Sequence, residues 1–477
     1  MMVTVTRAPE ATPYDLVVIG GGSAGLTSAG FGARLRTRVF LAAERLGGDC
    51  TWTGCIPSKA LIRAARLAYD LRRGGAIGIG GGELAIDFAR VMAEVRAVIA
   101  RVSSNETAEV LAKQGIEVAI GPVRFIDGET VDVGGRPIRG QHFVICTGAA
   151  PDLPVLDGLG STRFLTYETI FDLEELPVSL IVVGAGATGV ELAQAFARLG
   201  SRVTLIDERG AVLPEADPEA SAIIQARLIA EGVDIRLSTR IVDVVTRGGD
   251  VTVITPTESV AAASLLMATG RKPRVTGLDL ERAAVAVEGG AVKVDRHLRT
   301  TNPRIYAAGD VTGAVQFTHY AGWQGYVAAR NALLPGTEEG LRSSVPWAVF
   351  TDPEVAQAGL TETEASAQYG EIKVHRLELD RVDRAQTEDE RAGFLKLVSR
   401  TDGRLLGATV VSRPGGETIN ELALAVDRGL SVADLASTVH VYPTFGFAVQ
   451  QLAAEASLEA ATAGVRGRAL RALRRLS

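Results

Sequence analysis

A glycine-rich turn that occurs twice, each time after a short apolar strand, limits the possible folds of this chain more than any other feature. In the first copy, residues 16–19 (Leu-Val-Val-Ile) form an apolar run without alternation, which is typical of a buried parallel strand. A G-x-G-x-x-G turn follows, and we expect a helix through Leu35 and a second strand over residues 38–42. This order predicts a βαβ unit that binds a dinucleotide at its first turn. The glycines of the turn are Gly20, Gly22 and Gly25.

The second copy begins 164 residues later, with an apolar run over residues 180–183. We expect a helix over residues 190–199 and a strand over residues 203–206 after the turn. One such turn could be only a tight connection, but two copies in the same context indicate that the chain binds two dinucleotides. The glycines of this turn are Gly184, Gly186 and Gly189. Two similar segments, ending at Thr147-Gly148 and Thr269-Gly270, could each close one nucleotide domain.

The pattern of residues changes after Pro346, since no further glycine-rich phosphate-binding turn follows. We expect strands over residues 347–350, 373–379 and 394–398, and helices over 417–428 and 432–436. The predicted fold is therefore α/β, with two Rossmann-like dinucleotide-binding domains and a C-terminal α+β domain. The predicted limits are 1–150 with 273–342 for the first domain, 151–272 for the second, 343–455 for the third, and 456–477 for a basic tail.

Composition excludes several classes of protein. The chain has 477 residues, which suits about three domains, and its formal net charge of −6 argues against a nucleic-acid binder. Only 3 cysteines are present, too few for a secreted scaffold held by disulfides. The longest apolar run, residues 178–190, is shorter than the roughly 20 residues of a spanning helix, and we see no targeting segment. We expect a cytoplasmic protein without a membrane span.

Two of the cysteines, Cys50 and Cys55, lie in the segment Gly-Gly-Asp-Cys-Thr-Trp-Thr-Gly-Cys-Ile-Pro-Ser-Lys at residues 47–59. Pro57 suits the first turn of a helix, and the following residues are apolar at helical spacing. Cys55 should therefore lie at a helix N-terminus, where the helix dipole and Lys59 favour a thiolate. Two buried structural thiols, or half of a metal site, are the alternatives; no second cysteine pair completes a zinc site, and we predict no metal.

This segment resembles the redox-active disulfide of the pyridine nucleotide-disulfide oxidoreductases, which include dihydrolipoamide dehydrogenase, glutathione reductase and mercuric reductase. The resemblance extends to about residue 455. It implies that Cys55 faces the flavin in a charge-transfer pair and that Cys50 is the interchange thiol that meets the substrate. It also implies that Lys59 lies near flavin N5 with Glu191 as its ion-pair partner. Hydride from the nicotinamide would pass to the flavin, whose electrons then reduce the disulfide.

The resemblance places FAD on the first turn, with Gly48, Thr147 and Gly148 nearby. Asp310 resembles the acid that contacts the ribityl and phosphate region, and the segment around His319 resembles the one whose backbone meets the flavin pyrimidine. A satisfied core histidine is the alternative for His319. The acid that binds the adenine-side ribose in relatives falls on Ala43 here, so either Glu44 substitutes for it or the contact is absent; we favour Glu44.

The second turn, with Gly270, should hold the nicotinamide nucleotide. Asp207 ends the second strand of this unit, where an acid accepts the 2′-hydroxyl of NAD and repels a 2′-phosphate. Arg209 is the nearest basic residue. NADH is therefore predicted to be preferred over NADPH.

The C-terminal segment departs from the pattern of the thiol reductases in this family, whose H-P-T-x-x-E motif supplies an acid–base histidine across the dimer. Here Tyr442 stands at the histidine position and Phe447 at the glutamate position, while His440 lies two residues upstream. A tyrosine titrates near pH 10 and is a poor base at neutral pH. Either Tyr442 or His440 could take the role of the missing histidine.

The predicted protein is thus a homodimeric FAD- and NAD(P)H-dependent oxidoreductase that reduces a small-molecule acceptor through the Cys50–Cys55 disulfide. The acceptor would be a disulfide, a thiol-bound species or a metal ion. A diaphorase-like enzyme that reduces quinone, oxygen or metal ions directly from the flavin is one alternative. A flavin-based redox sensor is the other, and its only support is the basic tail.

Overall fold

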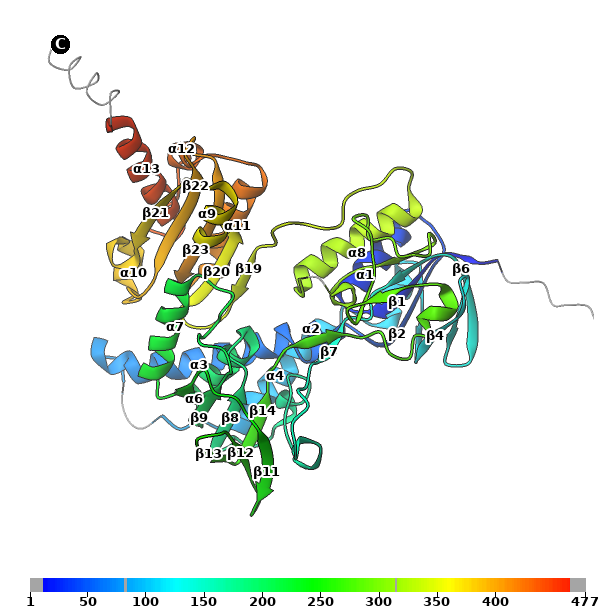
Figure 1. Cartoon of the computed structure of the whole chain (residues 1–477), viewed down its shortest axis with the longest axis horizontal. Helices are drawn as coiled ribbons and strands as arrows, with labels where there is room; N and C mark the ends of the chain where they lie inside the picture. Colours follow the sequence, from blue (N-terminus) through cyan, green and yellow to red (C-terminus); the bar gives the residue numbers. More distant parts are fainter. Residues whose placement is uncertain (1–11, 81–83, 314, 464–477) are drawn as a thin grey trace, which may run out of the picture.

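A computed structural model of the chain describes residues 12–80, 84–313 and 315–463. Three parts, each built on its own sheet, surround a central group of helices (Figure 1). The first sheet lies at the right of the view, the second at the bottom and the third at the upper left, with the C-terminal helix at its outer side. None of the helices in the described ranges is long and apolar enough to cross a membrane.

The first part contains the predicted βαβ unit, formed by β1 (Tyr14–Gly21), α1 (Ser23–Arg34) and β2 (Val39–Leu46). Residues 16–19 of β1 are almost completely buried because β1 lies between parallel strands and both of its faces pack into hydrophobic clusters. The sheet order is β3-β2-β1-β6-β5-β4. The remaining strands of this order are β3 (Ile116–Ile120), β4 (Val123–Asp127), β5 (Thr130–Val133) and β6 (Arg136–Ile145).

The chain returns to this sheet after an excursion of more than 150 residues. The strand β18 (Ile305–Ala307) pairs with β6 in parallel, and α8 (Thr318–Leu333) then packs on α1. Ser28 of α1 donates to the carbonyl of Gly325 at 2.9 Å, and a Cβ on Gly325 would meet Ala24 at 2.2–2.8 Å. The two helices therefore approach as closely as their backbones allow.

The second part repeats the βαβ pattern with β8 (Ser179–Val183), α6 (Ala187–Leu199) and β9 (Arg202–Ile206) in a parallel sheet of order β10-β9-β8-β14. A small antiparallel sheet lies beside it. Where the chain enters and leaves this part, β7 (Ala149–Pro151) pairs antiparallel with β15 (Arg271–Pro273). The other strands are β10 (Asp234–Arg236), β11 (Asp243–Arg247), β12 (Asp250–Ile254), β13 (Ser259–Ala262) and β14 (Ser264–Met267).

The third part is a five-stranded antiparallel sheet of order β19-β20-β23-β22-β21, covered by helices, so the α/β plus α+β architecture is confirmed. The predicted limit at residue 455 falls inside the last helix, and the arginines from Arg466 onward lie outside the described residues. The elements are β19 (Trp347–Val349), β20 (Glu354–Gly359), β21 (Ile372–Glu378), β22 (Phe394–Arg400), β23 (Leu405–Ser412), α9 (Glu362–Tyr369), α10 (Asp383–Thr387), α11 (Gly415–Asp427), α12 (Val432–Ser437) and α13 (Phe447–Thr462).

The helices α3 (Cys55–Arg73) and α6 lie side by side where the three parts meet, and a buried ion cluster joins them to the third part. Arg198 of α6 donates to Asp352 at 2.8 Å and pairs with Glu231, and all three side chains are at most 5% exposed. Arg66 of α3 lies 3.9 Å from the same Asp352 carboxylate. Because a buried charge is stable only with its partners, this cluster fixes α3 against α6 and the third sheet.

We predict that Arg198→Gln lowers the free energy of unfolding by about 3 kcal/mol or more, since it leaves two buried carboxylates without their main partner. Thermal unfolding of the wild-type and variant proteins measures the effect. The control is Arg101→Gln, which removes a 63% exposed partner of Glu94 and should cost less than about 1 kcal/mol. Equal midpoints for the two variants would contradict the role of the cluster.

Candidate active site

Both glycine turns and both cysteines open onto one continuous cavity of about 2010 Å³. The cavity extends from the N-terminus of α1, past the N-terminus of α3, to the N-terminus of α6. Its volume exceeds the roughly 300–1,000 Å³ of ordinary small-molecule pockets. A single cavity with a glycine turn at each end suits two dinucleotides whose reactive ends meet near the cysteines.

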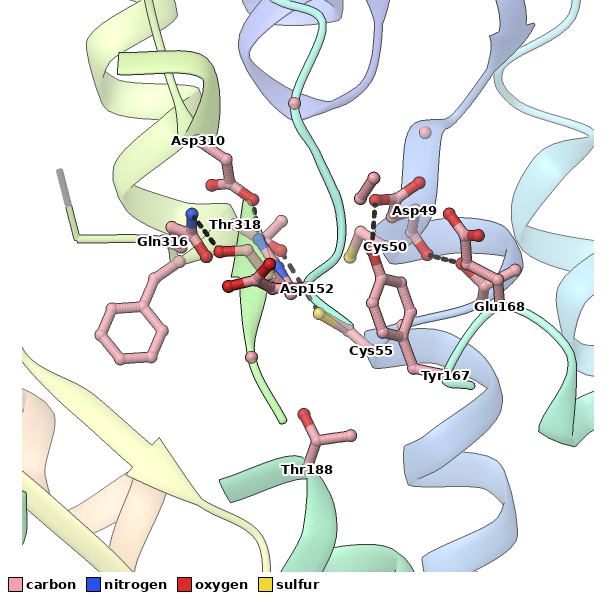
Figure 2. A pocket seen from close by; sticks show the side chains of 18 of the residues that line it. Asp49, Cys50, Cys55, Asp152, Tyr167, Glu168, Thr188, Asp310, Gln316 and Thr318 are labelled. Atoms are coloured by element: carbon pink, nitrogen blue, oxygen red, sulfur yellow. Dashed lines mark hydrogen bonds and ion pairs between the residues drawn. The ribbon is translucent and has the colours of Figure 1, made fainter. Parts of the chain in front are cut away.

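The two cysteines lie on consecutive helices because the chain turns sharply before them. Gly47 and Gly48 adopt left-handed φ angles of 91° and 61°, and the five-residue helix α2 (Gly48–Trp52) carries Cys50. The helix α3 then begins at Cys55, as the sequence predicted. Both cysteines are free and partly buried. Figure 2 shows the sulfur of Cys55 directed toward Thr318, with its Sγ atom 3.3 Å from Thr318 Oγ1.

The surroundings give the two thiols opposite acidities. A hydrogen bond from Cys50, assisted by Thr318 and the charge of Lys59, lowers the pKa of Cys55 to about 6 against the opposing effect of burial. The same hydrogen bond and burial raise the pKa of Cys50 far above its ordinary value. At neutral pH, Cys55 is therefore the thiolate and Cys50 the thiol that donates to it.

Lys59 and Glu191 form the predicted pair, with 2.9 Å between Nζ and Oε2. The second carboxylate oxygen of Glu191 accepts the backbone N–H of Phe350 at 2.8 Å, and Lys59 Nζ lies 4.4 Å from the centre of the Phe350 ring. Glu191 is buried, so it is not a solvated helix residue. One carboxylate thus joins α3, α6 and the third part beside the cysteines.

The first glycine turn fits the phosphates and ribityl chain of FAD. A Cβ on Gly25 would lie 1.8 Å from the carbonyl oxygen of Gly20, and one on Gly48 would lie 2.6 Å from Gly22 Cα, so only glycine leaves this cradle open. Asp310 lines the cavity and pairs with Arg271, whose buried Nε atom has no hydrogen-bond partner in the described ranges. Such an orphaned donor suits a polar group supplied by a cofactor.

The other residues predicted for FAD also line the cavity, but their surroundings differ. Thr147 uses its hydroxyl to donate to the carbonyl of Arg274, and Gly148 has a left-handed φ of 72°. Glu44 lies in β2, which runs past the predicted end of the strand, and its side chain is exposed to the cavity. His319 is exposed and bonds the carbonyl of Pro346 at 2.8 Å, so the alternative of a core histidine is wrong.

At the second turn, Gly184 has a φ of 110°, and a Cβ on Gly189 would lie 1.8 Å from the carbonyl oxygen of Gly184. Gly186 and Gly270 line the cavity here. Asp207 follows β9 as predicted, and it accepts the backbone N–H of Ala185 at 2.6 Å and an ion pair from Arg209. These contacts place Asp207 beneath the glycine turn.

His440 and Tyr442 do not line this cavity in the part of the chain that the structure describes. His440 has both ring nitrogens occupied: Nε2 lies 2.9 Å from the Glu421 carboxylate and Nδ1 lies 2.9 Å from the carbonyl of Thr438. Tyr442 is 59% exposed, and its hydroxyl donates to Asp383 at 2.8 Å. This hydrogen bond raises the pKa of Tyr442, which makes it a still poorer base.

The sequence did not indicate several contacts of the site. Thr318, from the segment around His319, lies beside Cys55, and Figure 2 shows Asp49 and Tyr167 next to Cys50. The hydroxyl of Tyr167 is 3.4 Å from Asp49, which is 3.6 Å from Arg274. Asp49 adjoins the motif cysteine and could have been suspected, whereas its partners come from distant segments. No group of three or more potential metal ligands occurs among the residues that the structure describes.

Two family models match the chain. The pyridine nucleotide-disulphide oxidoreductase model matches residues 14–325, and the model of the dimerisation domain of the same family matches residues 345–453. The chain belongs to the pyridine nucleotide-disulphide oxidoreductases. Members of this family are NAD(P)H-dependent flavoproteins, and FAD is the cofactor expected for them.

Similar members of the family have different activities. The chain is 37% identical to a mercuric reductase of Streptomyces lividans over 455 residues, which cover 92% of this chain and 95% of the relative. It is 36% identical to a dihydrolipoyl dehydrogenase of Thermus scotoductus over 457 residues, which cover 92% and 96%. Because the two sequence identities are nearly equal, they do not indicate which of the two activities this chain has.

Solved structures of the family share the fold over nearly the whole chain. LpdA of Mycobacterium tuberculosis superposes with a TM-score of 0.86 at 30% identity, covering 92% of this chain and 99% of LpdA. The HOCl-induced flavoprotein disulfide reductase RclA of Escherichia coli, in a Cu(II) complex, gives a TM-score of 0.83 at 30% identity, covering 93% and 100%.

The opposite acidities of the two thiols are testable in the reduced protein. The rate of alkylation of Cys55 should rise with pH through a midpoint near 6, because its thiolate forms there. Thr318→Val should move this midpoint upward, since the hydroxyl that stabilises the thiolate is lost. Mass spectrometry of iodoacetamide-treated protein measures each cysteine separately. A midpoint above 8 in the wild-type protein would contradict the assignment.

Proposed function

We propose that the protein transfers electrons from NAD(P)H, through FAD and a Cys50–Cys55 disulfide, to a small disulfide, thiol-bound or metal acceptor. FAD, when bound, accepts hydride from the nicotinamide and delivers an electron pair to the disulfide. The observation that carries the proposal is the thiolate of Cys55 beside the thiol of Cys50, at the point where the cavities of both dinucleotide folds meet.

The residues around the cysteines have separate roles in this proposal. Lys59 is held by Glu191 and presents its charge to the Cys55 thiolate. The phosphates of FAD would lie on the turn of Gly20, Gly22 and Gly25, at the N-terminus of α1, with Asp310 and Arg271 toward the ribityl chain. In the same proposal, FAD binds the domain formed by residues 1–150 and 273–342, and the nicotinamide nucleotide binds the domain formed by residues 151–272.

The proposed acceptors reflect the names of the relatives. These include mercuric reductases and dihydrolipoyl dehydrogenases, and one solved structure is a Cu(II) complex, so a metal ion and a small disulfide both remain proposed acceptors. We propose a homodimer, because the third part matches the family's dimerisation domain. Tyr442 would then enter the partner's site, where its hydroxyl would exchange its hydrogen bond to Asp383 for one to the acceptor, while His440 holds the segment through Glu421.

Cys50→Ser separates this mechanism from direct reduction by the flavin. The variant should keep its FAD and lose at least about 100-fold in kcat for an acceptor reduced through the disulfide, because no interchange thiol remains. Steady-state oxidation of NADH and NADPH with Cu(II), Hg(II), small disulfides and quinones measures it. The matched control is Cys146→Ser, a buried cysteine outside α2 and α3.

Unchanged turnover of every acceptor in Cys50→Ser would support the diaphorase-like alternative instead. No feature of the described residues supports the alternative of a redox sensor, because the basic tail that suggested it lies outside them.

Tyr442→Phe tests the role of the tyrosine hydroxyl. We expect kcat for acceptor reduction to fall roughly tenfold, about the value of one hydrogen bond, whereas the single-turnover rate of flavin reduction by NADH stays the same. Because the pKa of Tyr442 is raised, the wild-type rate should show no tyrosine-dependent change between pH 6 and pH 9. Stopped-flow absorbance separates the two half-reactions. An equal loss of rate in flavin reduction and in acceptor reduction would indicate that the substitution disturbs the structure and not the role of the hydroxyl.

A further inference from the structure

The interchange thiol needs a proton acceptor that the C-terminal segment does not supply. Cys50 donates its hydrogen to Cys55, and this bond together with burial raises the pKa of Cys50 far above its ordinary value. A thiol must lose its proton when its sulfur attacks a disulfide. Both ring nitrogens of His440 are engaged, and the raised pKa of Tyr442 makes it a poor base. The proton of Cys50 therefore has to pass to another residue of the cavity.

Asp49 is the acid adjacent to this thiol, on the same short helix α2. Both residues line the cavity, and the Asp49 side chain is 29% exposed. Figure 2 shows the carboxylate next to Cys50, on the side of the thiol where Tyr167 lies. An acid in this position can meet both the thiol and a molecule that enters the cavity.

The two neighbours of the Asp49 carboxylate orient it without occupying its oxygens. The hydroxyl of Tyr167 is 3.4 Å from Oδ2, and Nη2 of Arg274 is 3.6 Å from Oδ1. Both distances exceed the roughly 2.5–3.2 Å of a well-formed hydrogen bond, and the described ranges contain no other polar contact of this carboxylate. Glu191 differs, because its two oxygens accept at 2.9 Å and 2.8 Å. Asp49 therefore keeps lone pairs free to accept a proton.

The charges around Asp49 favour proton uptake by this residue. Burial and the charge of Asp49 raise the pKa of Tyr167, so the phenol stays protonated and cannot serve as the base at neutral pH. Arg274 also pairs with Glu168, so one guanidinium serves two carboxylates, and the nearby Arg271 is 6.0 Å from the Tyr167 ring. A proton on Asp49 would leave Arg274 with one carboxylate partner and would remove the excess negative charge.

We propose that Asp49 accepts the proton of Cys50 in the interchange step and so takes the role of the missing histidine. The inference rests on the proposed function, because it concerns the disulfide mechanism. As the Cys50 sulfur attacks one sulfur of an acceptor disulfide, its proton passes to Asp49 and the acceptor S–S bond breaks. Asp49 returns the proton to the leaving thiolate. The Cys55 thiolate then attacks the Cys50 sulfur, which restores the Cys50–Cys55 disulfide and releases the second thiolate; the electron pair of the dithiol ends on the acceptor.

Alkylation of the reduced holoenzyme by iodoacetamide tests Asp49 without any acceptor. Asp49→Asn should slow the initial alkylation of Cys50 at least about tenfold at pH 7, while the rate at Cys55 stays the same, because only Cys50 loses its proton acceptor. A carboxylate that acted only through its charge would disfavour a Cys50 thiolate, so its removal would speed the reaction. Faster or unchanged alkylation of Cys50 in Asp49→Asn would overturn the inference.

Single-turnover rates separate proton transfer from a disturbed structure. With 2-hydroxyethyl disulfide as the acceptor, Asp49→Asn should slow oxidation of the reduced enzyme about 100-fold at pH 7 and leave flavin reduction by NADH unchanged. The remaining rate should rise about tenfold per pH unit between about pH 6 and pH 8, since hydroxide then replaces the carboxylate. The matched control is Asp152→Asn, which removes the same charge from another cavity acid, paired with Lys272 at 3.9 Å, and should keep both rates.

The outcomes distinguish this inference from the proposed function. An equal loss in both half-reactions of Asp49→Asn, or a wild-type pH dependence in that variant, would overturn the role of Asp49 and leave the disulfide mechanism intact. Unchanged turnover in Cys50→Ser would instead refute the disulfide mechanism, whereas the alkylation rate of Cys50 in the reduced protein would still report on Asp49.

Discussion

The carboxylate of Glu191 connects the parts on which the proposed site depends. It pairs with Lys59 of α3, lies on α6, and accepts the backbone N–H of Phe350 at the start of the third part. The pair adjoins the redox cysteines, because Lys59 lies one helical turn after Cys55. A carboxylate this buried needs all of its partners, so the packing of three distant segments and the electrostatics of the Cys55 thiolate depend on the same group.

The sequence predicted the architecture well because its strongest signals are local. Each glycine turn stands between an uninterrupted apolar strand and a helix, and both βαβ units were found with their strand ends shifted by a few residues. Strands β20 and β23 were missed. The first carries Glu354 and Gln357, which are buried polar residues that interrupt its apolar pattern. The second is buried along its whole length and mostly apolar, with Gly407 near its start, so its residues do carry the pattern of a buried strand.

The site was predictable only as far as its residues lie in motifs. Cys50, Cys55 and Lys59 share one segment, and Glu191 follows a glycine turn at a fixed distance. Thr318, in contrast, was expected only as part of a segment near the flavin, and it reaches Cys55 because the chain returns to the first sheet. The acid–base assignment was limited for a different reason. His440 was a reasonable candidate by position, and only the contacts to Glu421 and Thr438 show that its nitrogens are engaged.

The ion cluster of Arg66, Arg198 and Asp352 constrains how nucleotides exchange. These groups lie at the junction of α3, α6 and the third sheet, and their side chains are at most about a quarter exposed. Separating the parts would leave these charged groups without their ion-pair partners. Wide opening of the second part is therefore costly. Entry and departure of the nucleotide should accordingly depend on small movements at the rim of the cavity, with the scaffold acting as a rigid frame.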